Sequence, residues 1–168
     1  MTTRISAKKR LMFIQKEDYN FLAYSLLVLL NTLGCNKDNK LFKDFRKIAY
    51  LVDFINQGGN FGEYNRDQLS LIYTKAHIKR QLLHHLLHIL SKKNYIGVSR
   101  NNKHKSFDLW IINENLPKDF LNKSFFENEI NNILILKDAI GNQSLKMMTL
   151  KDLSDIIFKT KNIITWEF

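Results

Sequence analysis

The sequence predicts a mainly α-helical protein, in which a winged helix-turn-helix with one β-hairpin is flanked by N- and C-terminal helices. Apolar residues recur at helical spacing through most of the 168-residue chain, and they make up 45% of it, which suffices for a buried core. In mid-chain, two helical patterns with a tight break between them directly precede two alternating strand patterns. We expect a basic N-terminal arm (1–16), an N-terminal helical part (17–62), a winged-helix segment (63–116) and a C-terminal helical tail (117–168).

The N-terminal arm carries only basic charges, and two helices are expected after it. Residues 19–33 are apolar on nearly every side, which is typical of a deeply buried helix. Residues 41–56 predict a second helix. Its apolar face consists of Leu41, Phe45, Ile48, Val52 and Ile55.

The apolar run at residues 21–30 has an alternative interpretation as a targeting signal. Together with the basic start and the stretch at 32–35, it resembles a bacterial lipoprotein signal. However, the run is about half as long as a membrane-spanning helix, and Glu17 and Asp18 interrupt the residues before it. We therefore interpret it as a core helix, and we expect a cytoplasmic protein that does not enter a membrane.

The winged-helix segment is predicted from the order of its elements. A short helix at 66–73 can be capped by Asn65, with Gln68 as the second member of a capping box. A longer helix at 75–92 follows after a tight break. Residues 95–100 and 107–112 then alternate like two strands around a polar turn, which is typical of a β-hairpin.

Three further helices are expected in the C-terminal tail. Pro117 fits the first turn of a helix at 117–126, and a second helix covers 128–140. Thr149, with an acid three residues later, opens a last helix. Trp166 and Phe168 are large aromatic residues near the end of the sequence. They are candidate partner-binding residues, with packing on the protein's own core as the alternative.

The charge distribution points to an anionic partner. The chain has a formal net charge of +10, and residues 68–107 contain no Asp or Glu but all five histidines. At 100° per residue, the polar side chains of the longer helix lie opposite its leucines. An acid-free face of this kind suits double-stranded DNA, with a solvated basic face as the alternative. The candidate nucleic-acid-binding residues are His77, Arg80, Gln81, His84, His88, Lys92, Lys93, Arg100, Lys103 and Lys105.

The sequence lacks the patterns that carry chemistry. The single cysteine, Cys35, excludes an internal disulfide and is interpreted as a buried or loop thiol. His77, His84 and His88 have spacings that could chelate a metal, but no acid or cysteine joins them in this segment. Phosphate-loop and dinucleotide motifs are absent. We therefore expect no catalytic residue, no metal and no cofactor.

The order of these features resembles the small middle components of bacterial ABC-three-component defence systems, which include the small subunit of Lamassu. The resemblance rests on the apolar helix at 19–33, the KIAYLVDF stretch at 47–54, the winged segment at 65–112, the Leu-Ser-Asp at 153–155 and the Trp-Glu-Phe at 166–168.

This resemblance implies a non-catalytic accessory subunit. Such a subunit would sit on an SMC/Rad50-like ATPase, contact double-stranded DNA, help sense foreign DNA and control an effector nuclease. Two alternatives remain open. One is a free-standing winged-helix regulator or plasmid replication factor, and the other is an adaptor whose winged domain binds protein.

Overall fold

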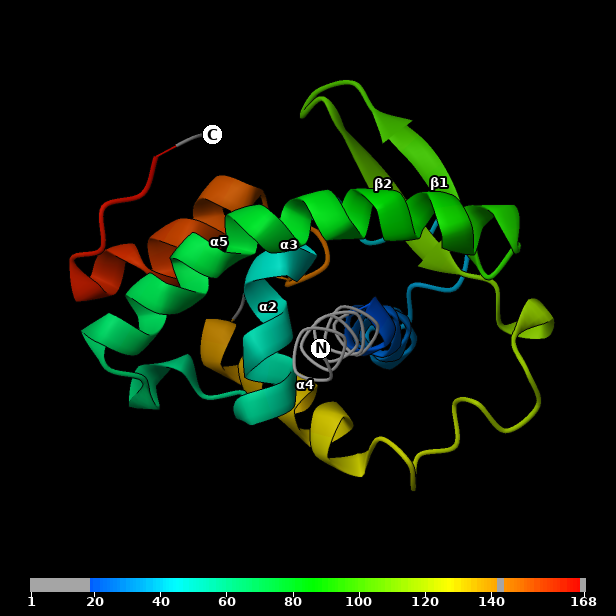
Figure 1. Cartoon of the computed structure of the whole chain (residues 1–168), viewed down its shortest axis with the longest axis horizontal. Helices are drawn as coiled ribbons and strands as arrows, with labels where there is room; N and C mark the ends of the chain where they lie inside the picture. The colour runs from blue at the N-terminus through cyan, green and yellow to red at the C-terminus, as the bar shows by residue number, and fades with distance from the viewer. Residues whose placement is uncertain (1–18, 142–143, 167–168) are drawn as a thin grey trace, which may run out of the picture.

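The helix α2 (Arg46–Gln57) is central to the fold. The computed structural model describes residues 19–141 and 144–166. Figure 1 shows α2 between α3 (Arg66–Lys92) on one side and α4 (Glu127–Ile140) on the other. The fold is mainly helical and has one two-stranded antiparallel hairpin, as expected from the sequence.

Helix α2 is buried on almost every side. Its buried residues are Lys47, Ile48, Ala49, Tyr50, Leu51, Val52, Phe54 and Ile55. The helix begins at Arg46, so the expected start at Leu41 is wrong. The reason is that Phe42 forms an antiparallel bridge with Leu109, which holds this part of the chain extended.

The N-terminal helix covers residues 19–32 of the described chain. Leu26, Leu29 and Leu30 are completely buried, which confirms the expected core helix. Phe21 and Tyr24 lie one turn apart and stay about half exposed. Over the residues that the structure describes, none of the helices combines the length and apolar character needed to cross a bilayer.

The longest element, α3, is a single uninterrupted helix. The expected break between a helix at 66–73 and another at 75–92 is wrong. No Gly or Pro interrupts the segment, and the Thr74 hydroxyl donates a hydrogen bond to the Ser70 carbonyl within the helix. Tyr73 and Ala76 are both buried on the face toward the core. The helix-turn-helix that we expected within this segment is therefore absent from it.

The start of α3 matches the prediction from the sequence. The Asn65 side chain accepts a hydrogen bond from the Gln68 backbone N–H, and the Gln68 side chain accepts one from the Asn65 N–H. This capping box satisfies two of the backbone N–H groups that a helix start leaves without partners.

The β-hairpin consists of β1 (Ile96–Asn101) and β2 (Ser106–Ile111), which pair in antiparallel register from Ile96 opposite Ile111 to Asn101 opposite Ser106. Both strands lie within two residues of their expected positions. Residues 35–45 run along the other edge of β2. The Cys35 carbonyl accepts from the Ile111 N–H, and the Phe45 N–H donates to the Phe107 carbonyl. Strand β2 thus has hydrogen-bonded neighbours along both edges, β1 on one and residues 35–45 on the other.

The segment 117–126 forms a series of turns, so the helix expected there is wrong. Asp119 has a φ of 64°, a left-handed conformation that ends any helix begun at Pro117. The Asn122 side chain then accepts from the Ser124 backbone N–H, which stabilises a local turn instead.

The remaining helices follow the prediction closely. The predicted helix at 128–140 is α4, and α5 (Leu150–Ile157) begins with the expected capping box between Thr149 and Asp152. Short 3-10 helices connect the larger elements at Phe61–Glu63, Asn113–Asn115 and Lys159–Lys161. In Figure 1 the C-terminal tail after the last of these rises on the same side of α3 as the hairpin.

Candidate nucleic-acid interface

A basic cleft lies where the start of α2, the middle of α3 and the turn of the hairpin meet. Its volume is about 520 Å³. The lining residues are Phe45, Arg46, Arg80, Gln81, His84, Lys105, Ser106 and Phe107. Four of the sequence-predicted residues therefore come together here: Arg80, Gln81 and His84 from α3, and Lys105 from the hairpin turn. No acidic side chain is among the lining residues.

Arg46 is a cleft residue that the sequence analysis missed. Its Nε and Nη2 donate to both carboxylate oxygens of Asp44, at 2.8 and 2.7 Å. Its Nη2 also donates to the His104 carbonyl in the hairpin turn, at 3.3 Å. Asp44 is only two residues away, but no sequence pattern shows that the hairpin turn lies against this pair.

Asp44 fixes the hairpin to the start of α2. It has a φ of 61°, and its carboxylate also accepts a hydrogen bond from the Ser106 hydroxyl at 2.7 Å. Burial alone would raise the pKa of Asp44, but the hydrogen bonds from Arg46 and Ser106 outweigh it and lower the pKa below its ordinary value. Asp44 therefore stays ionised. Its hydrogen bonds hold the cleft residues Arg46 and Ser106 in place in the absence of a ligand.

A second carboxylate extends this network. Asp108 on β2 accepts hydrogen bonds from the Asp44 backbone N–H and from the Asn101 side chain, both at 2.9 Å. Asn101 in turn accepts from the His104 backbone N–H at 3.1 Å. Both ends of the hairpin turn are thus held by polar contacts that are at least partly buried.

The histidines of α3 have separate surroundings. His84 packs against Phe45 and Phe107, with ring centroids 6.0 Å apart in each case. His84 and His88 both line a smaller pocket of about 210 Å³ beneath the hairpin. These two side chains remain exposed, so they border the cleft on its hairpin side.

His77 is held in an aromatic cluster. Its ring lies parallel to that of Trp166, with an interplanar angle of 1° and centroids 5.9 Å apart. It also meets the rings of Tyr50 and Tyr73 edge-on. The structure therefore gives His77 a packing role and separates it from the groove-facing stripe in which the sequence placed it.

The other predicted basic residues lie around the cleft without lining it. Lys103 is exposed in the hairpin turn, and Arg100 is exposed on β1 opposite Phe107. Lys92 and Lys93 are exposed at the end of α3. Since a helix rises 1.5 Å per residue, Lys92 lies about 18 Å along α3 from Arg80.

Of the two aromatic residues near the end of the sequence, the structure describes Trp166. Trp166 packs on α3, and its backbone is bonded to the Tyr73 hydroxyl, although 52% of the residue stays exposed. Trp166 therefore packs on the protein's own chain and remains partly accessible. Phe168 lies outside the described residues.

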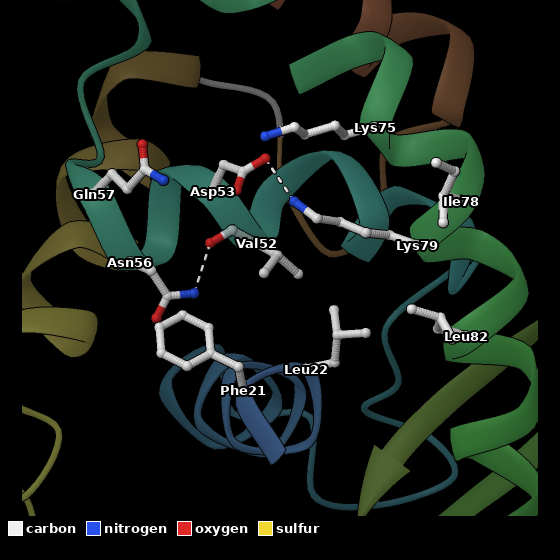
Figure 2. Close-up of a pocket in the computed structure, with 10 residues that line it drawn as sticks. All are labelled: Phe21, Leu22, Val52, Asp53, Asn56, Gln57, Lys75, Ile78, Lys79 and Leu82. Atoms are coloured by element: carbon white, nitrogen blue, oxygen red, sulfur yellow. Dashed lines mark hydrogen bonds and ion pairs between the residues drawn. The ribbon is translucent and has the colours of Figure 1, made fainter. Parts of the chain in front are cut away.

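A separate groove lies between α3, α2 and the N-terminal helix. Its volume is about 440 Å³, and its lining is mainly apolar. In Figure 2, Phe21 and Leu22 face Ile78 and Leu82 across it, and the ion pair between Lys79 and Asp53 closes one end at 2.6 Å. Lys75 points toward the same carboxylate. The residues Phe21 and Ile78 are 53% and 65% exposed, so this groove is an accessible apolar surface.

The core contains one buried amine. Lys47 is fully buried, and its Nζ donates to the backbone carbonyls of Leu145 and Met148 at 2.8 Å and of Lys146 at 3.3 Å. The Nζ also lies 4.3 Å from the centroid of the Phe42 ring. Burial lowers the pKa of Lys47 to about 7, against the opposing effect of nearby carboxylates.

The single thiol is also in the core. Cys35 is completely buried, which agrees with the interpretation from the sequence. Burial raises the pKa of Cys35 to about 11, although Lys146 and Lys47 act in the other direction. A neutral, enclosed thiol is a poor nucleophile.

Metal-binding groups do not gather in the part of the chain that the structure describes, where no three His, Cys, Asp or Glu side chains are placed to share an ion. In particular, His77 stacks on Trp166, whereas His84 faces Phe45 and Phe107. Comparisons of the chain with protein-family models, with curated proteins and with solved structures give no match.

Proposed function

We propose that this protein is a non-catalytic accessory subunit that contacts double-stranded DNA through the basic cleft. The observation that carries the proposal is the convergence of Arg46, Arg80 and Lys105, from three different elements, on one cleft without a lining acid. Arg80 and Lys105 at such a site neutralise phosphates, and Gln81 and His84 add hydrogen-bonding groups. The charge of Arg46 is already balanced by Asp44, so Arg46 mainly shapes the cleft. The rigid polar network behind Arg46 favours a preformed site.

The fold that we propose is a winged helix. Its two helices differ from the pair at 66–73 and 75–92 that the sequence predicted. We assign α2 and α3 as the two helices and the β1–β2 hairpin as the wing. Residues 35–45, bonded along β2, take the place of the third strand. The order helix, strand, helix, helix and hairpin supports this assignment, and it puts the cleft between the second helix and the wing.

The resemblance supplies the proposed partners. It supports an SMC/Rad50-like ATPase, an effector nuclease and a cytoplasmic role in antiviral defence. An accessory subunit of this kind needs a surface for its ATPase, and we assign the apolar groove around Phe21 and Ile78 to that contact. Exposed apolar residues of this size are typical of protein interfaces.

Charge reversal at the cleft tests DNA binding. The variant Arg80→Glu/Lys103→Glu/Lys105→Glu should bind a duplex at least tenfold more weakly at low salt while it keeps its circular dichroism spectrum. The matched control is Lys118→Glu/Lys123→Glu/Lys137→Glu, which makes the same change in net charge at exposed positions elsewhere. Equal weakening by both triple variants would show that only net charge matters and would remove the cleft from the proposal.

Co-purification separates the accessory subunit from a free-standing regulator or plasmid replication factor. When the protein is expressed together with the products of its neighbouring genes, the accessory role predicts a stoichiometric complex with a large coiled-coil ATPase. Ile78→Glu should disrupt that complex and leave duplex binding unchanged. A lone homodimer that shifts one DNA sequence would support the regulator instead.

A further inference from the structure

Trp166 is about half exposed although it is bonded to α3. The Tyr73 hydroxyl donates to the Trp166 carbonyl at 2.8 Å and accepts from the Trp166 N–H at 3.0 Å. The Tyr73 ring meets the indole edge-on, with centroids 5.4 Å apart. The tail is therefore tied to α3 at the residue that carries the indole.

The orientation of the indole is also fixed. His77 lies parallel to it, whereas 52% of the Trp166 residue remains exposed. A planar ring held by a stacked neighbour loses little conformational freedom when another flat group packs on it. Trp166 thus keeps an accessible surface on which another flat group can pack.

This surface adjoins the basic cleft. His77 and Arg80 are three residues apart on α3, and side chains at this spacing are neighbours on the helix surface. Arg80 lines the cleft together with Lys105 of the hairpin turn. Figure 1 shows the C-terminal tail and the hairpin on the same side of α3, so they flank its middle part from two directions.

We propose that Trp166 stacks on an unpaired nucleobase of a nucleic acid whose backbone lies in the cleft. The ligand class is then DNA with a single-stranded end or overhang next to a duplex. A flat aromatic surface beside cations is the arrangement by which proteins hold unpaired bases without reading their sequence. This inference rests on the proposed function, because the cleft provides the phosphate contacts.

Two oligonucleotides test the proposal in the full-length protein. One is a blunt duplex, and the other is the same duplex with a thymine overhang. Fluorescence anisotropy should show tighter binding of the overhang. Trp166→Ala should lower the affinity for the overhang by about 5- to 100-fold, the range known for loss of one stacked base, and should leave blunt-duplex binding within twofold. Trp166→Phe keeps an aromatic ring and should retain most of the overhang preference.

A spectroscopic signal reports the contact directly. The chain has two tryptophans, so Trp110→Phe leaves Trp166 as the only one. In this variant the overhang should quench the tryptophan fluorescence, and the blunt duplex should have a much smaller effect.

The outcomes distinguish this inference from the proposed function. If Trp166→Ala binds both oligonucleotides as the unaltered protein does, and the fluorescence is unchanged, stacking is excluded and Trp166 reverts to a protein-contact residue. In that case duplex binding still supports the cleft. If neither oligonucleotide binds the unaltered protein, the proposed function itself is refuted.

Discussion

At the scale of single residues, Lys47 is the most unusual group in the protein. An amine fully enclosed by the core is costly unless its hydrogens find acceptors. Here three backbone carbonyls of residues 145–148 accept from it. The amine thus ties the segment before α5 to α2. The burial of Lys47 was not predictable, because periodicity cannot show that a distant loop covers a charged residue.

We predict that Lys47 makes stability depend on pH. Its pKa is about 7 in the folded protein, whereas that of an unfolded lysine is about 10.4. Between these values the unfolded chain binds more protons, so the contribution of Lys47 to the free energy of unfolding should rise from pH 7 to pH 10. Urea unfolding of the unaltered protein and of Lys47→Met, over this range, measures the contribution as a difference between the two.

The comparison with Lys47→Met is needed because Cys35 acts in the opposite direction. Its pKa is higher in the folded state, so its contribution falls as pH rises above about 8.5. Because Lys47 also lowers the pKa of Cys35, the comparison is made in a Cys35→Ala background, where the difference between the two proteins isolates the amine. A difference that stays constant from pH 7 to pH 10 would contradict the prediction.

The thiol itself gives a second prediction. Cys35 is enclosed and its pKa is about 11, so the native protein should react with an aromatic disulfide reagent at pH 8 more than about 100-fold more slowly than the urea-unfolded protein. Absorbance of the released thiolate follows the reaction. A rapid native reaction would mean that residues 35–45 leave β2 readily.

At the scale of secondary-structure elements, capping patterns were more reliable than apolar periodicity or the expected order of elements. The capping boxes at Asn65 and Thr149 are confirmed, because these patterns depend on residues three positions apart. The break expected near Thr74 is wrong. It was predicted only from the order of two helices and a hairpin, and no Gly or Pro at this point supported it. Asp119, whose left-handed backbone ends the helix expected at 117–126, has no sequence signal of comparable strength.

The hairpin depends on a glycine for close packing. Gly97 lies opposite Trp110 in the register, and a Cβ atom at Gly97 would overlap the indole ring. Gly97→Ala should therefore displace Trp110 and destabilise the protein by about 1–3 kcal/mol. Urea unfolding monitored by tryptophan fluorescence checks this. Ser99→Ala on the same strand is the control, and equal effects of the two variants would contradict the packing argument.

At the scale of the whole molecule, the candidate site was only partly predictable. The acid-free mid-chain segment gave Arg80, Gln81, His84 and Lys105, because a charge pattern is visible in the sequence. Arg46 was not predictable, since its place in the cleft depends on the contact between α2 and the hairpin. His77 was misplaced, because the tail that packs on it lies 89 residues away in the sequence.

The cleft predicts a measurable dependence on salt. If four cations neutralise phosphates, two in the cleft and two elsewhere on the hairpin, the logarithm of the association constant should fall with the logarithm of salt concentration with a slope of about −3.6. Lys105→Gln removes one cleft cation and should reduce the steepness by about 0.9. Lys118→Gln, at an exposed position outside the cleft, should leave the slope unchanged. Identical slopes for all three proteins would show that Lys105 makes no phosphate contact.

The unbroken course of α3 has a geometric consequence. Twenty-seven residues of helix form a stiff rod of about 40 Å. Its middle part presents Ile78 and Lys79 to the groove and Arg80 and Gln81 to the cleft. The groove and the cleft therefore lie on two flanks of one unbroken helix, and no hinge in α3 separates them.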